Sequence, residues 1–337
     1  MTSPLLTDLH VKYIQRLGKS KDDLAYHLTA HLRLNAIYWG LTALCVMGHP
    51  DALDRDELIE FVMSCWDEEA GAFGAHPDHD AHMLSTLSGI QILLELNALD
   101  RLNSDRVVKF ILSLQQPSGV FAGDRYGEID TRFTYCAINA LSLIGRLGDW
   151  SEEARKRTIN YIRECHNYDG GFGNVIGAES HAAQVFVCMA ALTILDAVEE
   201  VLSPDDQETV SFWLSERQLP NGGLNGRPEK LEDVCYSFWV LSSLAILNKL
   251  EWIDRDKLVS FILSAQDTTK GGIADRPDDE PDVFHTQFGV AGLSLLGYPG
   301  LVDLDPVYCM PAALIEKMGL RKRWKALPRQ LVEPTTS

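Results

Sequence analysis

The sequence lacks any run of about eighteen uncharged apolar residues, so it predicts no transmembrane helix. The N-terminal stretch also lacks the basic-then-apolar order of a signal peptide. The seven Cys residues form no CxxC pair, and most of them lie in apolar helical runs. That pattern is typical of reduced thiols and not of a disulfide framework. We therefore expect a cytoplasmic protein that is not an integral membrane protein.

Basic residues are in short supply, with 30 Lys and Arg against 48 Asp and Glu, for a net charge of −18. This balance argues against nucleic-acid binding, which depends on contacts between Lys or Arg and phosphate. The acidic surface could serve solubility alone or could meet basic partners. The 46% hydrophobic content excludes a disordered chain and indicates a large core.

No alternating strand pattern of useful length and no interdomain linker is present, but the chain repeats itself. Five segments share a Gly-rich turn followed by one apolar anchor residue, at intervals of 48, 51, 52 and 49 residues. The anchors are Phe73, Phe121, Phe172, Leu224 and Ile273. A period near fifty is too long for two helices with tight loops, and it fits two helices plus one long structured loop.

Amphipathic segments precede the turns, for example 56–66, 105–115 and 256–266. A more apolar helix follows each turn, and segment 35–48 adds a sixth of this type. The alternation predicts an all-α fold, an α/α toroid or α6-α6 barrel of about six two-helix repeats around a central apolar cavity. An open superhelix is the alternative, but it needs capping repeats. We expect a single domain over 1–337, with 300–337 as a wrapping C-terminal tail.

Polar residues stand where each inner helix is expected to begin. His82, Asp130, His181 and Asp233 lie nine residues after their anchors, and a longer fifth loop is expected to place His285 twelve residues on. Helix capping is the default explanation for such residues.

Capping alone does not account for the combination of Asp233, Cys235 and His285. Asp, Cys and His are good zinc ligands. Residues at i and i+2 face apart inside a helix, so Asp233 and Cys235 can share a metal only at a frayed first turn. His285 follows Cys235 by one repeat period. Three protein ligands leave a fourth position open, as in catalytic zinc sites.

A second cluster flanks the first and consists of His181, Arg227, Lys230 and Tyr236. Helix N-termini, cations and a phenol together would hold a diphosphate, although an Arg–Lys pair on a loop is often only solvated. Large side chains on the inner helices would line the cavity and suit a long apolar ligand. They are Tyr38, Trp39, Arg132, Phe133, Tyr135, Phe238, Trp239, Phe284 and Phe288.

The segments RPEKLEDVCYSFWVL and DVFHTQFGVAGLSLLG resemble the β subunits of protein prenyltransferases. The resemblance extends over nearly the whole chain. The segments YWGLTAL, FAGDRYGEIDTRF, NYDGGFG, AESHAAQ and ERQLPNGGLNGRPEKLEDVCYSFWVL are most similar to the branch of this family that modifies Rab GTPases, also called type II. An α–α barrel is the fold that this family implies.

The resemblance also implies roles for individual residues. Zinc would be bound by Asp233, Cys235 and His285, with one zinc per heterodimer. The diphosphate of geranylgeranyl diphosphate would be held by His181, Arg227, Lys230 and Tyr236. The prenyl chain would lie against Arg132, Tyr135, Trp239, Asn35, Tyr38, Trp39 and Leu87. Asp275 matches a position assigned to magnesium in the farnesyl-transferring branch.

Partners follow from the same resemblance. The family implies a heterodimer with a helical-repeat α subunit, an escort protein that delivers the substrate, and Rab GTPases with C-terminal cysteines. The reaction would transfer a geranylgeranyl group to a cysteine thiol and form a thioether. No nucleic-acid partner is expected.

Small residues at the expected bottom of the cavity bear on chain length. The farnesyl-transferring relatives carry Trp and Tyr where this chain has Asn35 and Leu87, and Ser85 nearby is also small. The small size of these residues in the present chain would leave room in the cavity for one more isoprene unit. Alternatively, Asn35 only caps the first inner helix.

Three other classes compete with this interpretation. A terpene cyclase would need a DxDD or DDxxD motif, and the string at 277–282 has neither. A non-enzymatic toroidal binding module would leave the Asp–Cys–His set unexplained. A carbohydrate-active toroid would need paired carboxylates, for which Asp130 and Asp233 are the only tempting pair.

Overall fold

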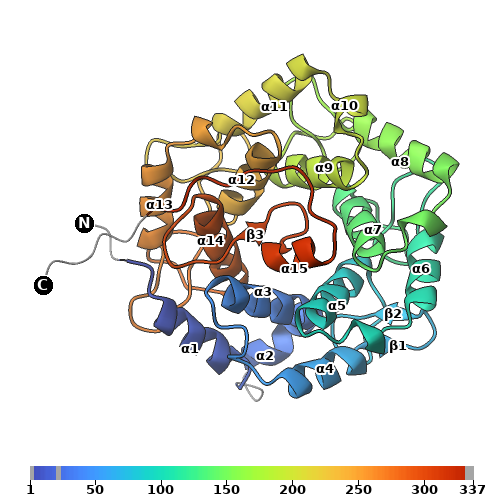
Figure 1. Ribbon diagram of the computed structural model, residues 1–337, viewed down its shortest axis with the longest axis horizontal. Coiled ribbons are helices and arrows are strands. Elements are labelled where there is room, and N and C mark those ends of the chain that lie inside the picture. The colour runs from blue at the N-terminus through green and yellow to red at the C-terminus, as the bar shows by residue number, and fades with distance from the viewer. Residues whose placement is uncertain (1–3, 20–23, 331–337) are drawn as a thin grey trace, which may run out of the picture.

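Six inner helices form a closed ring in the computed structural model, which describes residues 4–19 and 24–330 (Figure 1). They are α3 (Arg33–Val46), α5 (Met83–Glu95), α7 (Thr131–Leu143), α9 (Ala182–Ile194), α12 (Tyr236–Ile246) and α14 (Val283–Leu295). Each packs against the next, and α14 packs against α3. The ring is therefore closed, which confirms the predicted toroid and excludes the open superhelix.

Six outer helices surround this ring. They are α1 (Thr7–Leu17), α4 (Arg55–Ser64), α6 (Ser104–Ser113), α8 (Glu152–Glu164), α11 (Pro204–Ser215) and α13 (Arg255–Ser264). On α6 the apolar residues Val107, Val108 and Ile111 are buried while charged residues face water, as amphipathic spacing requires. The predicted segments 105–115 and 256–266 end two residues later than α6 and α13, because the chain already turns into the Gly-rich loop there.

Short elements complete the fold. The helices are α2 (Leu24–Leu28), α10 (Val198–Val201), α15 (Ala312–Lys317), η1 (Ala30–Leu32), η2 (Leu99–Arg101), η3 (Leu147–Asp149) and η4 (Leu250–Trp252). The strands β1 (Trp66–Asp67) and β2 (Ala72–Phe73) pair antiparallel, as do β3 (Leu304–Asp305) and β4 (Met310–Pro311). Within the described ranges, no helix is both long and apolar enough to cross a bilayer.

Five mouth loops join outer to inner helices at one end of the ring, over residues 66–82, 115–130, 166–181, 218–233 and 266–282. Their five anchor residues are fully buried. The residue nine positions after each anchor has its side chain hydrogen-bonded to a backbone N–H two or three residues further on. In the fifth loop that residue is Asp282, not His285. The expectation of a longer fifth loop was wrong, since Asp282 keeps the spacing and His285 is the third residue of α14.

Backbone hydrogen bonds link each repeat to the next at this end. At the start of each inner helix except the last, one backbone N–H donates to a carbonyl of the following mouth loop. The accepting residue lies two positions after the anchor of that loop. The pairs are Leu34–Ala75 (3.0 Å), Met83–Gly123 (2.7 Å), Thr131–Asn174 (2.9 Å), Ala182–Gly226 (2.8 Å) and Val234–Asp275 (2.9 Å). These bonds hold successive helix starts at one level, so that residues at equivalent positions face one another across the ring.

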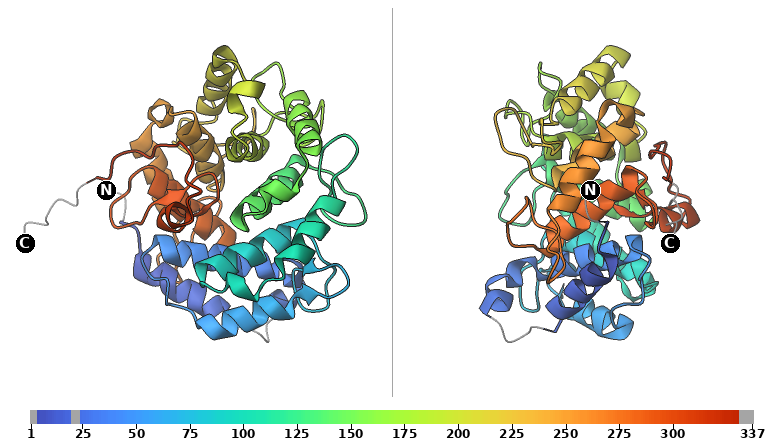
Figure 2. Two further views of the ribbon diagram at one scale, coloured as in Figure 1. Left: turned by 45° about the vertical axis from the view of Figure 1, so that its right-hand side comes forward. Right: turned by 90° about the vertical axis from the view of Figure 1, so that its left-hand side faces the viewer.

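The C-terminal segment closes the opposite end of the ring, and Figure 2 shows it on the side away from the mouth loops. The turn between β3 and β4, residues 307–309, is held by side chains from three inner helices. Tyr38, Gln91 and Tyr135 donate to the carbonyls of residues 309, 308 and 307, at 2.6, 3.0 and 2.8 Å. Of the predicted tail 300–337, the last seven residues lie outside the described ones.

Candidate active site

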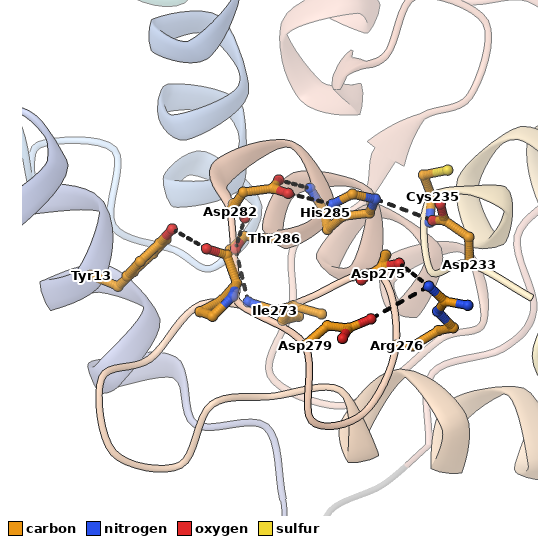
Figure 3. Close-up of polar contacts among 11 residues, drawn as sticks. Tyr13, Asp233, Cys235, Ile273, Asp275, Arg276, Asp279, Asp282, His285 and Thr286 are labelled. Carbon is orange, nitrogen blue, oxygen red and sulfur yellow. Dashed lines mark hydrogen bonds and ion pairs between the residues drawn. The ribbon is translucent and has the colours of Figure 1, made fainter. Parts of the chain in front are cut away.

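Asp233, Cys235 and His285 meet at the mouth, where α12 and α14 begin (Figure 3). Asp233 and Cys235 precede the first residue of α12, and the backbone N–H of Cys235 donates to Asp233 Oδ1 at 2.7 Å. His285 Nε2 lies 3.2 Å from the same oxygen. The three ligand atoms all lie within 4.8 Å of one another. The local backbone is not yet helical at Asp233, so residues two apart can face one point.

Asp282 orients the imidazole of His285. Its Oδ2 lies 2.6 Å from His285 Nδ1, and its Oδ1 accepts the backbone N–H of His285 at 2.8 Å. The carboxylate therefore fixes the ring and directs Nε2 toward Asp233 and Cys235. Histidine ligands of metals usually donate their other ring N–H to a carboxylate, a backbone carbonyl or a water. Sequence reasoning missed Asp282, although its nine-residue distance from Ile273 was a usable signal.

The donor set fits a zinc ion. His285 Nε2 is buried, and its 3.2 Å contact with Asp233 Oδ1 is not aligned as a hydrogen bond. Burial opposes protonation of His285, but its contacts with Asp233 and Asp282 outweigh burial and raise the pKa of the imidazole to about 9. Burial and the Asp233 charge raise the pKa of the Cys235 thiol. A divalent cation would reverse both preferences and favour thiolate and neutral imidazole.

The predicted anion-binding residues lie beside this cluster. His181 caps α9, its Nδ1 accepting the N–H of Ala183, and its Nε2 lies 3.3 Å from the hydroxyl of Tyr236. Burial, with Arg227 nearby, lowers the pKa of His181. Arg227 forms an ion pair with Glu179 of the preceding mouth loop. Lys230 is exposed, so the structure brings His181 and Tyr236 together while Lys230 extends into solvent.

An aromatic wall of Trp39, Tyr236, Trp239, Phe284 and Phe288 continues from the basic cluster across the inner helices. Phe284 joins the others, with ring centroids 4.9 Å from Trp39, 6.0 Å from Trp239 and 4.8 Å from Phe288. Trp39, Tyr236, Trp239 and Phe284 are only partly buried although they lie on inner helices. The wall therefore offers partly exposed apolar surface next to His181 and His285.

The remaining predicted lining residues differ in their surroundings. Phe133 packs on His82, with centroids 5.3 Å apart, and not on the aromatic wall. Arg132 forms an ion pair with Asp130, its Nε lying 3.0 Å from Oδ1. Asn35 is the third residue of α3, whose N-cap is Leu32, so the capping alternative was wrong.

Asn35 instead contacts the neighbouring inner helix. Its Nδ2 donates to Ser88 Oγ on α5 at 3.0 Å. Leu87, the residue before Ser88, is buried, as is Ser85. Asn35 therefore lies in the seam between α3 and α5, and Leu87 is next in sequence to its partner Ser88.

Asp275, the candidate magnesium ligand, forms an ion pair with Arg276, with Nη2 and Oδ2 3.1 Å apart. The same guanidinium reaches Asp279 at 3.5 Å. The backbone carbonyl of Asp275 accepts the N–H of Val234, so the loop that carries it is tied to the start of α12. Asp275 therefore borders the cluster of Asp233, Cys235 and His285, and among the described residues its carboxylate forms no hydrogen bond to that cluster.

An apolar groove of about 940 Å³ was not expected from the sequence. It lies between α1, α2, α3, α4 and the start of α14. Trp39 and Phe284 line both this groove and the aromatic wall. Its lining residues come from segments without a common period, so no sequence pattern indicates it.

Comparison with known proteins gives a consistent result. The family model "Prenyltransferase alpha-alpha toroid domain" matches residues 5–310. The chain is 54% identical over 316 residues to "Geranylgeranyl transferase type-2 subunit beta" of Saccharomyces cerevisiae, covering 93% of this chain and 96% of that one. It is 49% identical over 326 residues to the protein of the same name from Candida albicans, covering 93% and 94%.

Among solved structures, the fold is similar to that of "Candida albicans protein geranylgeranyltransferase-I complexed with GGPP". The TM-score is 0.81 at 24% identity, and the match covers 95% of this chain and 100% of the other. At this identity the likeness concerns the fold alone.

Proposed function

This chain belongs to the family of geranylgeranyl transferase type-2 β subunits, and from that premise we propose that it transfers a geranylgeranyl group from geranylgeranyl diphosphate to cysteine thiols of Rab GTPases. The observation that carries the proposal is the contact between two clusters. Cys235 of the metal-ligand set and Tyr236 of the anion-binding set are consecutive residues. A thiol held by the first set and a diphosphate held by the second would therefore be neighbours.

Zinc would be held by Asp233, Cys235 and His285, with Asp282 orienting the histidine. Bound there, it would favour the thiolate form of the substrate cysteine, which is the nucleophilic form. Asp275 is the candidate ligand for a magnesium ion, which would have to displace Arg276 from its carboxylate.

Arg227, Lys230, His181 and Tyr236 would act on the leaving group. As the sulfur–carbon bond forms and the allylic carbon–oxygen bond breaks, negative charge accumulates on the diphosphate. Cations and the Tyr236 hydroxyl, already positioned at the mouth, would stabilise that charge. Arg227 would exchange Glu179 for the diphosphate, because a dianionic group competes well with a half-exposed carboxylate.

The aromatic wall would hold the prenyl chain inside the ring, so that its allylic end points at the mouth. Because a β subunit is named as part of a larger enzyme, we propose a heterodimer with a helical-repeat α subunit, and substrate delivery by an escort protein in the cytoplasm. The chain from 1 to 337, including the C-terminal tail from 300, would act as one domain.

The test uses the heterodimer purified with its α partner. Cys235→Ala and His285→Ala should each lose most of the bound zinc and nearly all transfer, while binding of geranylgeranyl diphosphate survives. Cys165→Ala, which removes a buried cysteine outside the cluster, is the matched control. Stoichiometric zinc with wild-type turnover in either ligand variant would contradict the assignment.

A further inference from the structure

The fifth mouth loop, residues 266–282, packs against the first outer helix, α1. Three side chains of α1 form hydrogen bonds with backbone groups of this loop. The pairs are Arg16 with Lys270, His10 with Gly272 and Tyr13 with Pro281. A segment from the start of the chain therefore helps to fix the loop that leads into α14.

The Tyr13 contact holds a peptide unit that is also held from its other side. The carbonyl of Pro281 accepts the Tyr13 hydroxyl at 2.9 Å. The N–H of Asp282, which belongs to the same peptide unit, donates to the carbonyl of Ile273 at 3.3 Å. A peptide unit is planar, so two bonds to its oxygen and its N–H determine the orientation of the whole plane. The Asp282 carboxylate follows directly and contacts His285, and Figure 3 shows Tyr13 and His285 on opposite sides of Asp282.

This contact adds to a brace that several repeats share. Four residues after the capping residue, a threonine hydroxyl accepts the backbone N–H of the anchor residue. The pairs are Thr86 with Phe73 at 3.2 Å, Thr134 with Phe121 at 3.2 Å and Thr286 with Ile273 at 2.9 Å. Tyr13 comes from α1, outside these loops, so its hydroxyl is a constraint beyond the one that the repeat supplies.

The fifth loop leaves room for the Tyr13 ring at Gly272. This glycine has a φ of +91°, and a Cβ there would lie 3.0 Å from Tyr13 Cε1 and 2.8 Å from Pro281 Cβ. Burial, together with the charges of Asp282 and Glu280, raises the pKa of the Tyr13 phenol. The hydroxyl therefore stays protonated at neutral pH and can donate its hydrogen bond.

We propose that Tyr13 is a positioning residue for the metal-ligand set, and that it acts through the peptide unit between Pro281 and Asp282 to hold the imidazole of His285. The inference rests on the proposed zinc site and concerns a residue that belongs neither to the ligands nor to the anion-binding cluster. Without the hydroxyl, this peptide unit would keep one of its two hydrogen bonds and could rotate. The Asp282 carboxylate would then direct His285 Nε2 less precisely toward the other two ligands.

The experiment compares Tyr13→Phe with the wild-type heterodimer, because this change removes the hydroxyl and keeps the ring. Zinc affinity, measured by competition with a chelator, should fall about fivefold, since a directly bonded outer partner is worth about tenfold to a hundredfold and Tyr13 acts through one further hydrogen bond. The visible spectrum of the cobalt-substituted heterodimer should change as well, because its bands depend on ligand geometry. Affinity for geranylgeranyl diphosphate should stay at the wild-type value, because the anion-binding residues are unaltered.

Tyr298→Phe is the matched control. The Tyr298 hydroxyl accepts the backbone N–H of Leu5 at 3.1 Å, so it anchors the segment that precedes α1. The control loosens this segment and keeps the bond between Tyr13 and Pro281, so zinc affinity should stay at the wild-type value. Equal losses in the two variants would overturn the proposal, because the general attachment of α1 would then explain them.

A double-mutant cycle with Asp282→Asn tests the route of the effect. If Tyr13 acts through Asp282, Tyr13→Phe should change zinc affinity less in the Asp282→Asn background than in wild type, whereas independent effects would add in full. Additive losses, or an unchanged zinc affinity in folded Tyr13→Phe, would overturn the role of Tyr13 alone. A wild-type heterodimer that binds no zinc would instead refute the zinc site of the proposed function and the positioning role with it.

Discussion

At the scale of single residues, Asp282 shows how much one carboxylate contributes to the metal-ligand set. It contacts both the backbone and the ring of His285, so it determines the position of the imidazole and the nitrogen that carries the proton. Outer carboxylates of this kind raise the basicity of a histidine ligand and orient it.

Asp282→Asn should lower zinc affinity by about tenfold to a hundredfold, because the amide can accept the ring N–H but supplies no charge. Competition with a zinc chelator would measure the loss. Asp279→Asn, on the same loop and paired with Arg276, is the control and should keep wild-type affinity. Equal losses of zinc affinity in the two variants would show that the affinity depends on the net charge of the loop and not on the contact between Asp282 and His285.

Asn35→Trp should shift the lipid preference toward farnesyl diphosphate, because an indole at the seam between α3 and α5 takes the room of one isoprene unit. Five carbons at about 0.8 kcal/mol each correspond to roughly 3–4 kcal/mol of discrimination. The measurement is the ratio of transfer efficiencies for the two diphosphates. Asn35→Ala removes the hydrogen bond to Ser88 without adding bulk and should keep the preference; an unchanged ratio in a folded Trp variant would place Asn35 outside the lipid cavity.

The meeting of Asp233, Cys235 and His285 could be predicted because about one repeat period separates Cys235 from His285, which places both at the starts of adjacent inner helices, although the residue of α12 equivalent to His285 is Tyr236. The role of Asp282 is harder to find in the sequence, because His285 matches the residue type of the helix starts at His82 and His181 and so hides the constant nine-residue distance from Ile273. The hydrogen bonds of Tyr38 and Tyr135 to the turn at residues 307–309 could not be predicted. These hydrogen bonds join repeat residues to a C-terminal turn that is not part of the repeat, so the repeat period gives no information about them.

At the scale of elements, a buried histidine is one of the residues that attach α1 to the rest of the fold. His10 Nδ1 accepts the N–H of Gly272 at 2.8 Å, and His10 Nε2 lies 2.9 Å from Gln266 Oε1. The backbone N–H of Leu6 donates to the same Gln266 oxygen. The attachment of α1 thus depends on a neutral His10 imidazole, which accepts a hydrogen bond at Nδ1 and donates one at Nε2.

Burial lowers the pKa of His10, and the Gln266 hydrogen bond only partly opposes this. The unfolded chain therefore binds a proton at higher pH than the folded one. The contribution of His10 is complete above about pH 6.5 and is lost as the pH falls toward the lower folded-state pKa. Wild type should thus lose about 1 kcal/mol more stability than His10→Gln on acidification.

Thermal unfolding of both proteins from about pH 7.5 to about pH 5.5 would measure this difference. The other buried histidines are common to both proteins and cancel in the comparison. Parallel stability curves would mean that His10 does not control the attachment of α1.

At the scale of the whole molecule, negative charge is concentrated at the mouth. The five mouth loops hold 19 Asp and Glu residues against five Lys and Arg, so most of the net charge of −18 lies there. A cleft lined by one sign of charge attracts ligands of the other sign over distances limited by salt.

Among peptides that end in the same cysteines, those with lysine upstream should therefore react with higher kcat/KM than those with glutamate upstream. The ratio should fall toward unity as ionic strength rises, because screening weakens the attraction between exposed charges. Initial rates with matched peptides at low and high salt would measure it. A ratio that does not depend on salt would mean that the peptide approaches without sensing the loop charges.

Ring closure also has a consequence for biosynthesis. The seam between α3 and α14 joins one of the first helices to leave the ribosome with one of the last. A nascent chain must carry the unpaired apolar faces of α3 and the aromatic wall until almost the whole polypeptide has emerged. Such exposure during synthesis favours aggregation and makes a chain dependent on chaperones. A premature stop codon before α14 would therefore leave an open arc of repeats for the cell to degrade.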